Sequence, residues 1–168
     1  MASEVPPAYS TGPRGSEWPR DWLDFDHYQV VHARYMDVLY RDGFVHSDSL
    51  AFTLFTLHGA VRQVSLEGVI CCSNDVDIEV TKYMDTRMSG RRLQVLSTYY
   101  RYHAYRPLKG GGPVLRYDCA HDHLHYHRFD PAGTQVRYDS LAFADMPRLD
   151  SVVREAVDLV RAWDTDSS

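Results

Sequence analysis

The sequence predicts an α+β fold that is mostly β: an antiparallel meander of about six to eight strands with one C-terminal helix packed on a face. Two observations lead to this class. From residue 51 to residue 138, segments rich in β-branched and aromatic side chains alternate with short turn signals. Near the C-terminus, apolar side chains recur at the spacing of a helix. The short turns favour pairing between consecutive strands.

The expected strands cover residues 51–57, 61–72, 76–86, 93–106 and 114–117, then a histidine-rich segment, then residues 134–138. Turn signals separate them: His58-Gly59, Ser89-Gly90, Lys109-Gly110-Gly111-Gly112-Pro113 and Asp130-Pro131-Ala132-Gly133. Residues 76–86 begin with strict alternation, which places Val76, Ile78 and Val80 on one face of a strand.

Residues 28–40 are ambiguous, because their apolar positions match a helix nearly as well as a strand. The turn signal Arg41-Asp42-Gly43 that follows favours a strand that enters a hairpin.

One helix is expected over residues 147–163, where Pro147 stands near the start and its missing N–H costs least. An apolar stripe runs along this helix and consists of Leu149, Val152, Val153, Ala156, Leu159, Val160 and Trp163.

Residues 1–20 are rich in Pro, Ser and Gly, and we expect a flexible tail there, followed by a single globular domain over residues 21–168. With 44% hydrophobic and 24% charged residues, the chain of 168 residues can build one ordinary core. Neither a signal peptide nor a membrane span is expected, since no apolar stretch approaches about 20 residues. Three cysteines without a CxxC pair favour a reducing cytoplasm.

Charge is unevenly distributed along the chain. The formal net charge of -5 argues against a protein that coats nucleic acid indiscriminately. Residues 82–116, however, contain eight basic residues and a single acidic one, Asp85. Basic and aromatic side chains of this segment could bind phosphates and stack on bases. The candidate substrate-binding residues are Arg91, Arg92, Arg101 and Tyr102.

The most informative segment contains four of the nine histidines at every second position: His121, His123, His125 and His127. In an extended strand this spacing puts all four on one face. Successive residues on that face are about 6.6 Å apart and the outer pair about 20 Å apart, whereas zinc needs nitrogens at about 2.0–2.1 Å. One His-x-His pair could therefore hold a metal, but the four cannot share it.

Two kinds of site remain open, besides a polar strand without a chemical role. A site for zinc, iron or manganese would use a His-x-His pair from among His123, His125 and His127, with a third ligand from a neighbouring strand or loop. The candidates for that ligand are His103, Asp118, Asp130 and Glu79. A metal-free site would instead hold an acid and a base, because imidazole titrates near neutral pH.

The Gly-rich run lacks the spacing of a phosphate-binding loop and is expected to connect a hairpin. That hairpin would set His103 and Arg101 across from Arg116 and Asp118. In metal-free RNA cleavage, one imidazole would take the 2'-hydroxyl proton, another would protonate the leaving 5' oxygen, and arginine would stabilise the phosphorane. In the metal version, a His-x-His pair and a carboxylate would hold a metal with an open position for substrate.

The motifs between residues 99 and 130 resemble those of a known group. They are Tyr100-Arg101-Tyr102-His103, then Arg116-Tyr117-Asp118-Cys119-Ala120-His121, then His125-Tyr126-His127. This pattern is similar to that of the TumE-like proteins of bacteria, which carry an Arg-Tyr-Asp-Asn-x-x-His motif and a His-x-His pair. Cys119 replaces the asparagine of that motif, and His123 is an additional imidazole. The resemblance implies a toxin role and a partner antitoxin.

The first hypothesis is therefore an RNA-cleaving toxin that requires no cofactor. Its catalytic candidates are His103, Arg116, Asp118, His121, His125 and His127. The alternative is a metal-dependent enzyme that acts on a small molecule in a β-sheet concavity.

Overall fold

The computed structural model describes residues 22–120, 123–142 and 145–166, and the tail expected over residues 1–20 lies outside them. The elements, in chain order, are β1 (Leu23–Asp24), α1 (Phe25–Arg41), β2 (Val45–Asp48), β3 (Ala51–Leu57), β4 (Ala60–Cys72), β5 (Val76–Ser89), β6 (Arg92–Arg106), a short 3-10 turn η1 (Pro107–Lys109), β7 (Gly112–Ala120), β8 (His123–Phe129), β9 (Gln135–Leu141) and α2 (Leu149–Asp166).

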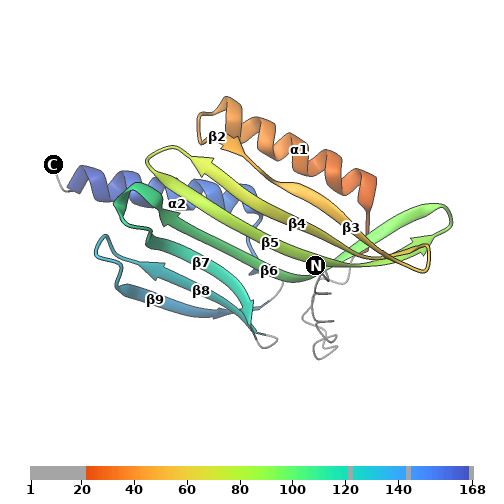
Figure 1. The fold of residues 1–168 in the computed structure, drawn as a ribbon. Coiled ribbons are helices and arrows are strands. Elements are labelled where there is room, and N and C mark those ends of the chain that lie inside the picture. Colours follow the sequence, from red (N-terminus) through yellow and green to blue (C-terminus); the bar gives the residue numbers. More distant parts are fainter. Residues whose placement is uncertain (1–21, 121–122, 143–144, 167–168) are drawn as a thin grey trace, which may run out of the picture.

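The strands form one nine-stranded antiparallel sheet with the order β2-β4-β5-β6-β7-β8-β9 (Figure 1). From β4 to β9 each strand pairs with the next one in the chain, so the predicted mostly-β meander is confirmed. Beside this path, β3 shares the edge of β4 with β2, and β1 pairs with β6. The sheet has more strands than expected because β1 and β2, with two and four residues, are too short to show alternation.

Residues 28–40 lie within α1, so the interpretation of this segment as a strand is wrong, and the described residues form two α-helices rather than one. Asp24 caps the helix, since its side chain accepts a hydrogen bond of 3.0 Å from the backbone N–H of His27. Gly43 then adopts a φ of 77° just after the helix ends. A glycine with positive φ follows many helices as well as many hairpin strands, and this shared signal caused the error.

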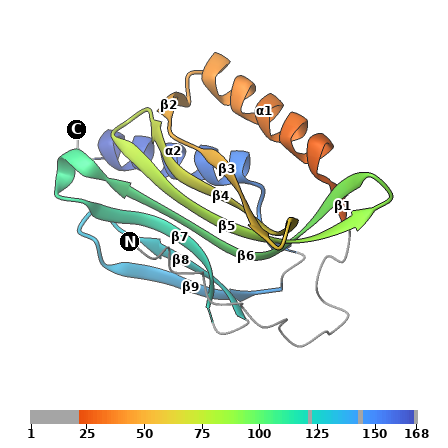
Figure 2. The same cartoon turned by 45° about the vertical axis from the view of Figure 1, so that its right-hand side comes forward.

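Both helices lie on the same side of the sheet, which Figures 1 and 2 show from two directions. The hydroxyl of Tyr28 on α1 accepts a hydrogen bond from the Lys82 ammonium on β5. On α2, the Glu155 carboxylate accepts hydrogen bonds from the hydroxyls of Tyr117 (2.8 Å) and Tyr126 (2.5 Å). The main core fills the space between helices and sheet. Its fully buried side chains include Leu39, Ile70, Ile78, Leu115, Val152, Val153 and Val160.

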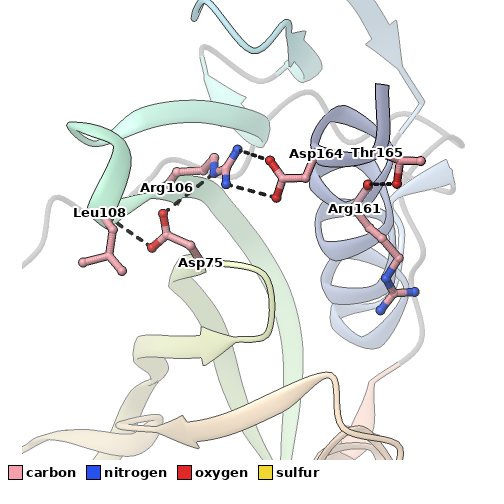
Figure 3. Close-up of polar contacts among 6 residues, drawn as sticks. All are labelled: Asp75, Arg106, Leu108, Arg161, Asp164 and Thr165. Carbon is pink, nitrogen blue, oxygen red and sulfur yellow. Dashed lines mark hydrogen bonds and ion pairs between the residues drawn. The ribbon is translucent and has the colours of Figure 1, made fainter. Parts of the chain in front are cut away.

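The C-terminal end of α2 is tied to two loops of the sheet (Figure 3). The guanidinium of Arg106 donates to both carboxylate oxygens of Asp164, at 3.1 and 3.3 Å. The same guanidinium lies 3.8 Å from Asp75 in the turn between β4 and β5, and Asp75 also accepts a hydrogen bond from the backbone of Leu108. These contacts connect the end of the helix to both sheet turns.

Gly68 permits two short strands to share one edge of β4. Its φ is 148°, and a Cβ atom there would lie 2.6 Å from the carbonyl oxygen of Ser49. Ser49 connects β2 to β3 and exchanges hydrogen bonds with Val69 next to this glycine. Glycine is required because the crossing chain comes too close for any side chain.

No helix among the described residues is long and apolar enough to cross a membrane.

Candidate functional site

The face of the sheet that points away from both helices carries the predicted site. Strand register places two rows of residues directly across β5 to β9. The first row is Glu79, His103, Arg116, His127 and Tyr138. The second row is Thr81, Arg101, Asp118, His125 and Ser140. The expected pairing of His103 and Arg101 with Arg116 and Asp118 is therefore confirmed.

Arg116 stands at the centre of the first row, with a histidine on the neighbouring strand at either side. Its Nε lies 2.7 Å from a carboxylate oxygen of Asp118, which is two residues along the same strand face. Its Nη2 lies 3.3 Å from Nε2 of His127. The Asp118 side chain is 15% exposed and that of Arg116 is 37% exposed, so water screens this ion pair only in part.

His127 and His125 are both held from β9. Nδ1 of His127 lies 2.7 Å from the amide oxygen of Gln135, which can only accept, so Nδ1 carries a hydrogen and Nε2 points toward Arg116. Nδ1 of His125 contacts the hydroxyl of Tyr138, whose ring also packs 5.0 Å from the ring of His127. Two side chains of β9 thus fix the orientation of two imidazoles.

His103 lies half-buried between Glu79 on β5 and Arg116 on β7. Burial lowers its pKa most, and the charge of Arg101 lowers it further. Glu79 acts in the opposite direction but does not outweigh burial. The imidazole of His103 is therefore neutral at pH 7 and can accept a proton.

The histidine row is only partly within the described residues. His123, His125 and His127 lie on one face of β8, as predicted, with 6.3 Å between the centroids of successive rings. His121 lies outside the described residues. Within the part of the chain that the structure describes, no three His, Cys, Asp or Glu side chains converge on a position that could hold a metal ion.

Two aromatic residues of the motifs face the core instead of the site. Tyr102, predicted to bind substrate, is 3% exposed and lies on the helix-covered face, so its predicted role in stacking on a base is wrong. Tyr117 contacts Glu155 on that same side. The period of two explains both placements, because each is adjacent in sequence to a residue of the open face.

The two remaining substrate-binding candidates lie far from the histidines. Arg91 and Arg92 are exposed at the tip of the hairpin between β5 and β6. Arg92 forms an ion pair of 3.5 Å with Asp24. They belong to the basic segment but not to the central cluster.

Gln135 and Tyr138 are site residues that the sequence reasoning missed. Both come from β9, where no histidine, arginine or acidic residue points to the open face. Counting back from the contact between Asp130 and Thr134 would have placed Arg137 opposite His127, but a register shift between Arg128 and Phe129 puts Tyr138 there instead.

No known family model matches the chain, and no curated protein or solved structure is significantly similar to it.

Proposed function

We propose that the protein is an RNA-cleaving enzyme that works without a metal on the open face of the sheet. One observation carries this proposal: Arg116 is paired directly with His103 on one side and with His127 on the other. Cleavage of RNA by its own 2'-hydroxyl needs an arginine at the phosphate, a base on one side of it and an acid on the other. The row across β6, β7 and β8 has this order.

The chemistry assigns a role to each member of the row. His103 is the base, because burial keeps it neutral, and it takes the proton of the 2'-hydroxyl as that oxygen attacks phosphorus. The phosphorane charge falls on the Arg116 guanidinium, which Asp118 orients. The bond from phosphorus to the 5' oxygen then breaks, and the imidazolium form of His127 transfers its Nε2 proton to the leaving oxygen. The products are a 2',3'-cyclic phosphate and a free 5'-hydroxyl.

Distance supports the assignment. Neighbouring strands are about 4.8 Å apart, which puts the backbones of His103 and His127 about 10 Å apart, with Arg116 midway. The base and the acid each make a hydrogen bond of about 2.8 Å to one of the two reacting oxygens, which lie in line through phosphorus. This arrangement matches the distance of about 10 Å between the strands of His103 and His127. His125 lies beside His127 on the same face and can contact the adjoining phosphate or base.

The toxin role and its setting belong to the same proposal. The motifs around Arg116, Asp118, His125 and His127 resemble those of the TumE-like toxins, and these are the residues that the sheet brings together. A bacterial cytoplasmic toxin of this kind would be neutralised by a partner antitoxin.

The test is cleavage of a labelled RNA by protein purified without a histidine tag, in EDTA. Arg116→Lys should lower kcat/KM at least about 100-fold although it keeps the charge, since lysine loses the planar fork that holds a phosphorane. His127→Asn should lower it to a similar extent. His46→Ala on β2, an exposed histidine on another strand, is the matched control and should keep full activity.

The products and the metal dependence decide between the hypotheses. An RNA with a 2'-O-methyl group at the cleaved position should resist, because it has no nucleophile. Full cleavage of that RNA, or wild-type turnover by Arg116→Lys, would refute the proposal. Activity that disappears in EDTA and returns with zinc, iron or manganese would instead favour the metal-dependent enzyme built on His123, His125 and His127.

A further inference from the structure

β9 is the last strand of the sheet, and its outer edge is open in the described structure. No strand of the described residues pairs with that edge, and five of the seven residues of β9 are exposed. Two of them are large and apolar: Val136 is 57% exposed and Tyr138 is 51% exposed. Proteins usually protect such an edge with proline, lysine, a bulge or a very short strand; β9 has seven residues without proline or lysine, and its register shift lies only at its first end.

The charges of β9 are arranged symmetrically. Arg137 precedes Tyr138 and Asp139 follows it, and both charged side chains point to the face opposite that of Tyr138. Two identical strands that pair antiparallel around a two-fold axis through Tyr138 would set Arg137 of each copy opposite Asp139 of the other. Opposite charges and aromatic pairs across strands stabilise a sheet, whereas like charges directly opposite destabilise it.

Other registers are worse. A two-fold axis perpendicular to the sheet keeps each side chain on its own face, so only residues of the same face can stand opposite one another. An axis one residue earlier sets Arg137 against Arg137, and one residue later sets Asp139 against Asp139. Among registers centred on these three residues, only the one at Tyr138 pairs every charge with its opposite.

We propose that β9 pairs with β9 of a second copy of this chain, centred on Tyr138. The proposal does not rest on the function proposed above. The two sheets would join into one, and the axis would keep both open faces on the same side. Because Tyr138 contacts His125 and packs against His127, the contact strand also borders the histidine row, and the two rows would lie on one continuous polar face.

The opposite edge of the sheet offers no comparable register. β2 and β3 share that edge; β2 has four residues, and the longer β3 contains no charged side chain that would select one pairing over another. Its Phe52 also packs against Phe25, Tyr28 and His32 of α1, which lies beside that edge.

Sedimentation equilibrium of the full chain with exchanged charges tests the proposal. The wild type should form dimers in a concentration-dependent manner. Arg137→Asp and Asp139→Arg each set like charges opposite one another in two places, and each should raise the dimer dissociation constant about tenfold or more. An equal mixture of the two variants should dimerise again, because opposite charges then face each other across the interface. Circular dichroism checks that both variants fold.

The mixture separates the proposed contact from a local effect. Arg137 and Asp139 also form an ion pair of 2.6 Å within their own strand, and mixing two variants cannot restore that pair. A wild-type chain that stays monomeric at several hundred micromolar would overturn the proposal, as would variants that dimerise like the wild type or a mixture that fails to recover.

Cross-linking tests the register independently. Directly opposed residues in an antiparallel pair have Cα atoms about 4.5–5.5 Å apart, within reach of a disulfide. When diamide is added, Tyr138→Cys should therefore form a disulfide-linked dimer. Diamide is the oxidant and accepts the two electrons and two protons of the thiols. Ser140→Cys should not, because in this register Ser140 faces Val136 of the second copy. Equal cross-linking of both variants would contradict a pairing centred on Tyr138.

Discussion

The two faces of the sheet are built from the same strands but from alternate residues, and they differ in what their polar groups contact. On the covered face, polar side chains are few and are held by the helices: Lys82 lies under Tyr28 of α1, and Tyr117 and Tyr126 bond to Glu155 of α2. On the open face, polar side chains from β5 to β9 contact one another across strands. The first arrangement fixes the helices, and the second leaves a row of groups at the surface.

β7 shows this division within a few residues. Leu115 and Tyr117 point into the core, whereas Arg116 and Asp118 point to the open face and form an ion pair. Neighbouring positions should therefore respond to substitution in opposite ways: loss of stability on one face, loss of activity on the other. Variants at neighbouring or matched positions test this contrast.

The largest effect on stability is expected for Leu115→Ala. Leu115 has no exposed surface, so its truncation leaves a cavity that costs about 2–5 kcal/mol of the free energy of unfolding. Arg116→Lys, one residue away on the open face, should change this free energy by less than about 1 kcal/mol. Urea unfolding of both variants measures the difference. Equal destabilisation would show that Arg116 has a structural role.

Lys82 is the exception on the covered face, because it is a cation within the core. The side chain is 7% exposed, and its Nζ lies 4.7 Å from the centre of the Tyr28 ring and 4.6 Å from that of Tyr100. Burial lowers the pKa of Lys82 to about 7. Replacement by the apolar Lys82→Met should therefore stabilise the protein by about 1–4 kcal/mol at pH 6.

The pH dependence of that gain tests its cause. The pKa of Lys82 is about 7 in the folded chain and about 10.5 in the unfolded chain. Between these two pH values the unfolded chain binds a proton that the folded chain lacks, so stability rises with pH. The advantage of Lys82→Met should shrink as pH rises from 6 to 9.5. A constant difference in unfolding free energy over this range would show that packing, not charge burial, distinguishes the two chains.

A smaller effect is expected from removal of one hydroxyl on each face. Tyr117→Phe deletes a hydrogen bond of 2.8 Å to Glu155 and should cost about 0.5–1.5 kcal/mol. Tyr138→Phe deletes the contact with His125 at the exposed edge of the sheet and should leave thermal stability nearly unchanged. A shift in Tm as large for Tyr138→Phe as for Tyr117→Phe would contradict the contrast between the faces.

The sequence predicted the long elements and the central pairing well, because both depend on local patterns. Alternation and turn residues placed β3 to β9, and the Gly-rich connection set His103 opposite Arg116. The period of two also put the histidines of β8 on one face. α1 was missed because Gly43 with positive φ ends a helix as readily as it opens a hairpin.

The contributions of β9 could not be read from the sequence in the same way. Tyr138 lies opposite His127 only because the register shifts between Arg128 and Phe129, and a one-residue shift has no signature in side-chain type. Tyr102 was chosen as a substrate-binding residue for its chemistry, although its position in the alternation places it on the covered face.

The smallest effect concerns His103, the open-face histidine that is half-buried. Burial and Arg101 lower its pKa below the pKa of about 6.5 that histidine has in an unfolded chain. As pH falls through this range, the unfolded chain binds a proton before the folded chain does, so the contribution of His103 to stability is lost. NMR titration of the ring should give a midpoint below 6.5. His103→Gln should weaken the loss of stability between pH 7 and pH 5 by a small amount, since the imidazole is partly solvated. A midpoint above 6.5 would mean that Glu79 and Asp118 outweigh burial, and His103 would then be the acid of the row rather than its base.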